Sequence, residues 1–118
     1  MALHNTLGKL GEILSWSWLK KNGFMIIEQN WRHGRYEIDV IVTKEGILHF
    51  VEVKTRHASP FGNPEDSVTR KKFRRMRIAA QAYLNMFPGH SWIQYDILAI
   101  TLAGNGEAEY CFLEDVFL

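Results

Sequence analysis

The sequence has one cysteine, Cys111, and three prolines among 118 residues. A single thiol excludes an intrachain disulfide and a cysteine-based zinc site, and it fits a reducing compartment best. No apolar run approaches the ~18 residues of a membrane span. Residues 1–5 lack the basic region and apolar core of a secretory signal. These absences predict a cytoplasmic protein that has no membrane segment.

Net charge is also nearly absent, at +1, but the charges are unevenly distributed. Residues 54–77 contain eight basic and two acidic residues, and the rest of the chain contains six basic and eleven acidic ones. This asymmetry predicts a basic patch on an acidic body. Six of the cations follow one another without an acid between them, which favours a nucleic-acid backbone over simple solvation. The candidate nucleic-acid-binding residues are Arg56, Arg70, Lys71, Lys72, Arg74, Arg75 and Arg77.

Apolar residues make up 47% of the sequence and charged residues 23%, as in soluble globular proteins. A chain of this length buries about two-thirds of its unfolded surface, which is enough for one domain over residues 1–118. Capping residues and turn signals predict helices over residues 5–22 and 70–87, the first starting near Asn5 or Thr6. They predict strands over residues 24–31, 36–43, 47–55, 92–102 and 107–113.

The predicted order is α-β-β-β-α-β-β. A helical crossover between the third and fourth strands makes those two strands parallel if they share a sheet, whereas hairpins make their neighbours antiparallel. The sequence therefore predicts an α/β fold in which helices flank a mixed β-sheet.

The second and third strands carry the most informative polar residues. A turn over residues 44–46 makes these strands antiparallel neighbours. Alternation places one set of side chains on one face of the sheet, namely Ile38, Val40, Val42, Val51, Val53 and Thr55. The other face then holds Asp39, Glu52 and Lys54, which are expected to converge.

Phosphodiester hydrolysis is the chemistry that this trio suits. Two neighbouring carboxylates repel each other unless a hard cation such as Mg²⁺ or Mn²⁺ takes an oxygen from each. Asp39 and Glu52 are therefore the candidate metal ligands. Lys54 could position the attacking water or offset charge on the transferred phosphate. The alternative is that Glu52 and Lys54 are partners on a solvated sheet face.

Glu12 has an unusual setting in the first predicted helix. Leu7, Leu10, Ile13, Leu14 and Trp18 share one side of that helix. Glu12 lies roughly opposite, in a sector of small and apolar residues where a merely solvating carboxylate is unexpected. Gly8 and Gly11 would let another backbone approach closely. The alternative for a lone helical glutamate is an ordinary surface position.

Six stretches of the sequence form a set that is typical of one family: Gly8-Lys9-Leu10-Gly11-Glu12, Asn30-Trp31-Arg32, Glu37-Ile38-Asp39-Val40-Ile41, Phe50-Val51-Glu52-Val53-Lys54-Thr55-Arg56, Phe61-Gly62-Asn63-Pro64 and Tyr95-Asp96. On these residues the chain resembles the YraN family of small bacterial proteins, which looks like part of the restriction-endonuclease-like PD-(D/E)xK superfamily. The resemblance implies Asp39 and Glu52 as metal ligands, Lys54 as the catalytic lysine and Glu12 as a helix-borne catalytic carboxylate. A similar arrangement is found in archaeal Holliday-junction resolvases.

Three functions follow as expectations. The first is a Mg²⁺- or Mn²⁺-dependent endonuclease that acts on DNA rather than RNA, including branched or damaged DNA in repair or recombination. The second is a nucleic-acid-binding module that cuts nothing. The third is an adaptor that binds another protein through Ile78 and residues 114–118. A homodimer is compatible with each of them.

Overall fold

The structure is a computed structural model, and it describes residues 2–58 and 70–117, with side chains from residue 6 onward. Its elements are α1 (Ala2–Lys21), β1 (Met25–His33), β2 (Tyr36–Lys44), β3 (Ile47–His57), α2 (Arg70–Met86), β4 (Ile93–Leu102) and β5 (Ala108–Leu113). The predicted order α-β-β-β-α-β-β is confirmed. The largest difference in boundaries concerns α1, which begins at Ala2 rather than near Asn5 or Thr6.

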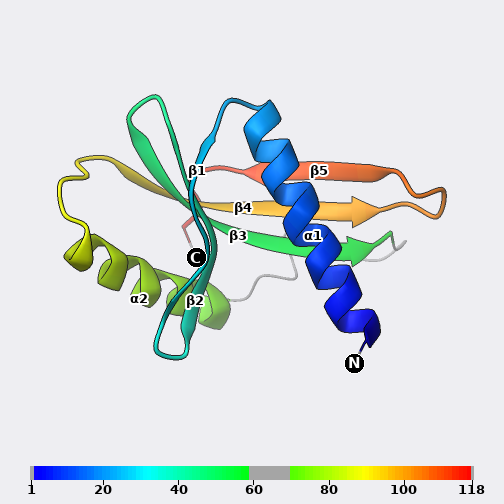
Figure 1. Ribbon diagram of the computed structural model, residues 1–118, viewed down its shortest axis with the longest axis horizontal. Coiled ribbons are helices and arrows are strands. Elements are labelled where there is room, and N and C mark those ends of the chain that lie inside the picture. Colours follow the sequence, from blue (N-terminus) through cyan, green and yellow to red (C-terminus); the bar gives the residue numbers. More distant parts are fainter. Residues whose placement is uncertain (1, 59–69, 118) are drawn as a thin grey trace.

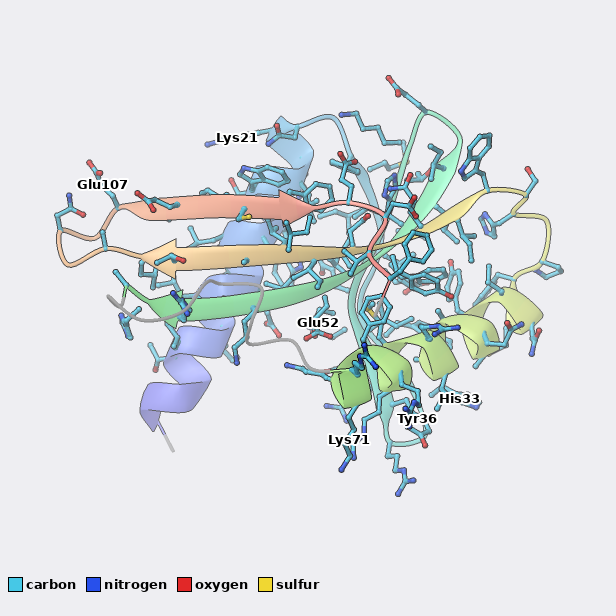
Figure 2. All side chains as sticks on the ribbon, turned by 180° about the vertical axis from the view of Figure 1, so that it is seen from behind. Lys21, His33, Tyr36, Glu52, Lys71 and Glu107 are labelled. Carbon is cyan, nitrogen blue, oxygen red and sulfur yellow. The ribbon has the colours of Figure 1, made fainter. Side chains whose placement is uncertain are left out.

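The five strands form one sheet in the order β1-β2-β3-β4-β5. Strands β3 and β4 are parallel, and the other neighbouring pairs are antiparallel. Helix α1 crosses one face of the sheet and α2 lies against the other, as Figures 1 and 2 show from opposite sides. This confirms the predicted mixed sheet flanked by helices. Within the described residues, neither helix has the length and apolar character that a membrane crossing requires.

Each helix covers its own apolar core. Helix α2 contributes Phe73, Met76 and Tyr83 to a cluster that includes Phe50 of β3. The 3.6-residue apolar period from Phe73 to Phe87 indicates this buried face, but Phe87 itself, beyond the end of α2, is 43% exposed. On the other face, Leu19 of α1 packs with a cluster of aliphatic strand residues, namely Val40, Val42, Val51, Leu98 and Ile100.

Helix α1 faces the sheet with its small residues rather than with its most apolar side. Gly11, Ser15 and Leu19, spaced four residues apart, are buried, whereas Leu10 and Ile13 are 40% and 58% exposed. The close approach explains this orientation, because a Cβ atom on Gly11 would lie 2.9 Å from the Cβ of Thr55 in β3. Larger side chains would hold the helix away from the sheet. The expected close approach is confirmed at Gly11, where the neighbour is the Thr55 side chain, and is wrong at Gly8, where a Cβ atom would meet nothing within 4 Å.

The regular alternation predicted for β2 is wrong at Asp39. Ile38 does not share a face with Val40, since Ile38 packs in the cluster of α2 and Val40 in the cluster of α1. The change of face coincides with an irregular residue in the neighbouring strand. Asn30, between the paired residues Gln29 and Trp31 of β1, has a φ of 51°. A left-handed residue inside a strand increases its local twist and turns the following side chains.

The C-terminal residues are held against the fourth strand. Asp115 N–H donates to Asp96 Oδ1 at 2.9 Å, and Val116 N–H donates to the carbonyl of Tyr95 at 2.8 Å. The other carboxylate oxygen of Asp96 lies 2.6 Å from Nδ1 of the buried His49. Two backbone groups of the segment expected for an adaptor are therefore bound to β4, whereas the side chains of Phe117 and Ile78 are 85% and 42% exposed.

The packing of α1 against β3 predicts opposite effects for two glycine substitutions. Gly11→Ala should lower the free energy of unfolding by about 1–3 kcal/mol, because the added methyl group collides with Thr55. Gly8→Ala is the matched control, since a Cβ there meets no atom within 4 Å. That substitution should raise stability by up to about 1 kcal/mol through helix propensity. Urea unfolding measures both effects, and equal changes would contradict the packing described here.

Candidate functional site

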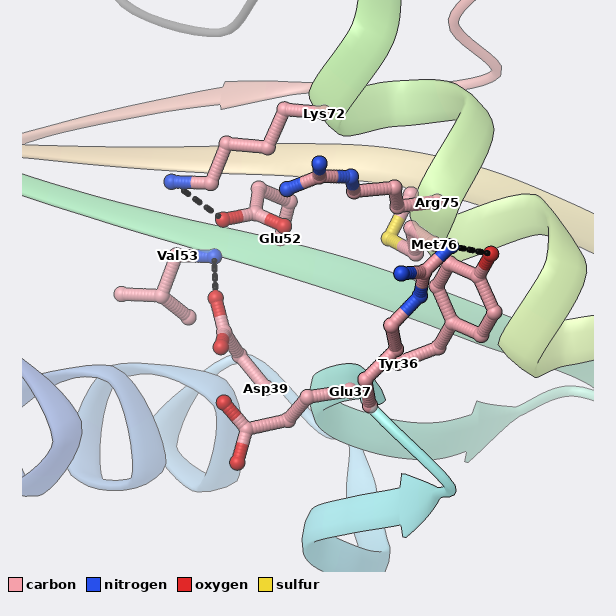
Figure 3. Close-up of a pocket in the computed structure, with 9 residues that line it drawn as sticks. Tyr36, Glu37, Asp39, Glu52, Val53, Lys72, Arg75 and Met76 are labelled. Atoms are coloured by element: carbon pink, nitrogen blue, oxygen red, sulfur yellow. Dashed lines mark hydrogen bonds and ion pairs between the residues drawn. The ribbon is translucent and has the colours of Figure 1, made fainter.

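The candidate site lies where β2 separates from β3. The ladder between these strands ends at the pair Val40–Val51, whereas β3 stays paired with β4 as far as His57–Leu102. Asp39 is the first residue of β2 beyond that ladder. Its Oδ2 atom accepts a hydrogen bond of 2.7 Å from the backbone N–H of Val53 (Figure 3). The side chain thus fixes the place where the two strands part.

Glu52 faces α2 from the opposite side of this junction. Its side chain is only 7% exposed, and Oε2 lies 3.1 Å from Nζ of Lys72 in the first turn of α2. Figure 3 shows Glu52 between Lys72 and the backbone of Val53, with the Asp39 carboxyl on the other side of that strand segment. Both acids line one cavity of about 270 Å³, together with Glu37 and Arg75.

A second cavity of about 280 Å³ adjoins the first and is lined by Glu12, Lys54 and Thr55. Asp39, Val53 and Lys72 line both cavities. The two therefore form a continuous depression across the exposed edge of β3, with α1 on one side and α2 on the other. All four predicted catalytic residues border it: Glu12, Asp39, Glu52 and Lys54.

The electrostatics of the depression centre on Asp39. Burial raises the pKa of its carboxyl well above the ordinary value, and the negative charge of Glu52 raises it further. The hydrogen bond from Val53 opposes this shift by favouring the charged carboxylate, while a hydrogen bond with Glu52 and the charge of Glu37 add to it. Two acids held this close need either a proton or a cation between them.

The donor set fits a hard divalent cation. Mg²⁺ is commonly held by one or two carboxylates and completes its octahedron with waters and phosphate oxygens. Asp39 and Glu52 provide two carboxylates, and the Lys72 ammonium already places positive charge beside Glu52. Across residues 6–58 and 70–117, no three His, Cys, Asp or Glu side chains gather as a metal cluster. An all-protein cage of the zinc type is therefore not built in this part of the chain.

The candidate nucleic-acid-binding residues divide into groups. Arg70, Lys71 and Arg74 are exposed on α2, and Lys72 and Arg75 border the depression. Arg77 instead lines a separate apolar cavity with Phe73 and Tyr95. There its charge opposes the rise that burial causes in the pKa of Tyr95. Arg56 of β3 is partly buried.

Sequence reasoning missed the contribution of the hairpin between β1 and β2. Arg35 and Tyr36 at its tip line the first cavity, and the Arg35 guanidinium lies 5.4 Å from the centre of the Tyr36 ring. Glu37 borders the same cavity and pairs with Arg32 at 3.1 Å. Gly34, with a φ of 60°, forms the tip of this hairpin four residues after Asn30. In the sequence, this glycine between two strands is the only sign that a hairpin tip could lie near the site.

The arrangement defines a small α/β protein with two neighbouring carboxylates where the second and third strands of a mixed sheet separate. Residues 11–100 match the model of uncharacterised protein family UPF0102, also known as YraN, and the chain belongs to this family. The resemblance to the YraN family seen in the sequence is thereby confirmed. One of its motifs, residues 61–64, lies outside the described residues.

Relatives with about 40% sequence identity cover most of the chain. A UPF0102 protein of Bacteroides fragilis is 41% identical over 100 residues, which cover 85% of this chain and 83% of that protein. One from Flavobacterium johnsoniae is 43% identical over 112 residues, covering 92% and 89%. One from Clostridium perfringens is 39% identical over 116 residues, covering 97% and 95%. These names give the family and state no activity.

The raised pKa of Asp39 predicts how stability depends on pH in the absence of divalent ions. The folded protein binds this proton more tightly than the unfolded chain does, so stability decreases as pH rises from about 3.9, the ordinary value, through the raised pKa. Asp39→Asn keeps an oxygen for Val53 and removes the titration. The variant should therefore gain stability relative to wild type as pH rises.

Urea unfolding between pH 4 and pH 8 in chelator measures this difference. Glu109→Gln, at an exposed position on β5, removes the same formal charge and serves as the control. A stability difference between Asp39→Asn and wild type that stays constant over this range would contradict the electrostatic account.

Proposed function

We propose that this protein is a Mg²⁺- or Mn²⁺-dependent endonuclease that hydrolyses phosphodiester bonds in DNA. The observation that carries the proposal is the single depression bordered by Asp39, Glu52 and Lys54 beside the basic helix α2. A carboxylate whose pKa is strongly perturbed by burial and by a neighbouring charge, and which lines a cavity, is typical of a functional site. The expected cytoplasmic location and the absence of a membrane partner belong to the same proposal.

Each side chain has a separate task in this proposal. Asp39 and Glu52 hold the metal ion, and the hydrogen bond from Val53 fixes the orientation of the Asp39 carboxylate. The bound ion supplies Lewis acidity toward the phosphate and lowers the pKa of a coordinated water. Lys54 offsets the negative charge that grows on the phosphate, and it orients the water. Glu12, which borders the second cavity from α1, would be the residue to accept a hydrogen bond from the attacking water.

Helix α2 provides the electrostatic attraction for the nucleic acid. Its first two turns carry six cations without an acid, and their side chains are exposed. Lysine and arginine at such a surface bind successive phosphates and release counterions. Because Lys72 and Arg75 lie at the border of the depression, a backbone bound along α2 passes beside the carboxylates.

Cleavage assays distinguish an endonuclease from a binding module. Linear, single-stranded, flapped and four-way DNA should be incubated with Mg²⁺, with Mn²⁺ and with chelator, and the proposal expects metal-dependent cleavage of at least one substrate. Glu52→Gln should abolish that cleavage and weaken metal binding, because a neutral amide is a poorer Mg²⁺ ligand. Lys54→Ala should retain metal binding and lose roughly 10²- to 10³-fold in turnover.

The control for these variants is Glu107→Gln, since Glu107 lies in the loop between β4 and β5, far from Glu52 (Figure 2). It should cut like wild type. If no DNA is cut with either metal while DNA still binds, the protein is a binding module. If Lys54→Ala cuts as fast as wild type, the mechanism is wrong.

Salt dependence tests the role of α2. Lys71→Ala combined with Arg74→Ala should reduce the slope of log affinity against log salt by up to about two, since each lost phosphate contact contributes ~0.9. Lys20→Ala combined with Lys21→Ala removes the same charge from the last turn of α1, and Figure 2 shows Lys21 at the opposite side of the molecule from Lys71. This control should leave the slope unchanged. Equal slopes for all three proteins would favour the adaptor function.

A further inference from the structure

Lys72 differs from the other cations of α2 because it reaches an acid of the site. We infer that Lys72 competes with the metal ion for Glu52, and that nucleic acid relieves this competition by drawing the lysine to a phosphate. The inference rests on the proposed function and adds to it a coupling between the two ligands. Metal and nucleic acid would then each raise the affinity for the other.

The geometry of the ion pair makes Lys72 the movable partner. The Glu52 side chain is 7% exposed and belongs to a central strand, whereas the Lys72 side chain is 46% exposed. Nζ and Oε2 are 3.1 Å apart, which is direct contact. A lysine has four methylene groups and a strongly hydrated ammonium, so its charge can leave the acid without any change in the backbone of α2.

Competition follows from the position of the ammonium. Lys72 lines both cavities of the depression, as Asp39 does. A cation that binds between Asp39 and Glu52 would contact the Glu52 carboxylate where the ammonium now lies. Two positive charges in contact with one carboxylate repel each other, so the lysine weakens the binding of the metal ion and the metal ion weakens the ion pair. Without either cation, Glu52 would be a buried and unpaired charge, which is strongly unfavourable.

Nucleic acid changes this balance because it offers the lysine another anion. The residues beside Lys72 on α2 are exposed cations, including Lys71 and Arg75, and they would hold a phosphate backbone within reach of it. Once the ammonium binds a phosphate, Glu52 becomes available to the metal. Thermodynamic linkage then requires that metal binding raise the affinity for nucleic acid by the same factor.

Manganese binding measures this coupling directly, without any turnover. The affinity of the full chain for Mn²⁺ is measured from the paramagnetic resonance signal of the free ion. In the absence of nucleic acid, Lys72→Met should bind Mn²⁺ about 5- to 50-fold more tightly than wild type, within the usual range of coupling between ligands. Lys71→Met removes an equal charge from the adjacent residue and should change the affinity less than about twofold.

The second arm adds a duplex oligonucleotide in a Lys54→Ala background, in which cleavage does not disturb the measurement. Duplex should raise the Mn²⁺ affinity of the protein with Lys72 and should change it little in the Lys72→Met version. Lys72→Gln provides a second variant, and circular dichroism shows which variants are folded.

The outcomes separate this inference from the proposed function. If wild type and Lys72→Met bind Mn²⁺ with the same affinity, and duplex has the same effect on both, the competition is overturned while the metal site stands. If neither protein binds Mn²⁺ with or without duplex, the metal site itself is overturned, and the inference fails with it. If Lys71→Met and Lys72→Met both bind Mn²⁺ more tightly than wild type, the gain in affinity comes from the loss of any positive charge nearby. That result would overturn the specific role of Lys72.

Discussion

The separation of β2 from β3 is the constraint on which the candidate site depends. Antiparallel strands normally satisfy their backbone groups with each other, and a strand that leaves its neighbour exposes those groups. Here the Asp39 carboxylate takes the Val53 N–H at 2.7 Å, so the strands part with this donor still bonded. The same bond places a carboxyl beside Glu52 in a partly buried setting. The hydrogen bond between Asp39 and Val53 therefore does two things: it satisfies a backbone N–H that β2 no longer pairs, and it brings two acids together.

The two helices complete the depression because both reach the part of β3 that β2 has left. Helix α1 approaches one face, where Gly11 lies against Thr55, and this contact brings Glu12 to the second cavity. Helix α2 approaches the other face, where Lys72 pairs with Glu52. Alternation along β3 sends Thr55 to one helix and Glu52 to the other. Strand β3 thus contacts α1 with one face and α2 with the other, and it brings side chains of both helices to the depression.

The sequence predicts the regular parts of this arrangement well. The element order, the mixed sheet and the facing of Glu52 follow from turn signals and from period-2 alternation. The change of face at Asp39 does not follow: it coincides with the left-handed Asn30 in the neighbouring strand, and alternation assumes a straight strand. The orientation of α1 was also not predictable from apolarity, since close packing selected Gly11 and Ser15 over Leu10 and Ile13. The ion pair between Lys72 and Glu52 could not be predicted either, because it depends on how closely α2 packs against β3, and sequence patterns do not give that distance.

The charges of the depression give the site its chemical character. Asp39 and Glu52 cannot both remain ionised at close range without a counter-charge, and Lys72 supplies one in the structure. In our account, a divalent ion takes over that role when nucleic acid binds along α2. The acids, the lysine and the basic helix then act as one unit rather than as separate surface features.

Anomalous diffraction at the manganese edge, from crystals grown with Mn²⁺ and a short duplex, tests this account most directly. We expect a manganese peak in contact with Asp39 and Glu52, with the Lys72 ammonium moved from Glu52 to a phosphate. A structure in which Mn²⁺ and duplex are bound elsewhere, and Lys72 still contacts Glu52, would contradict it.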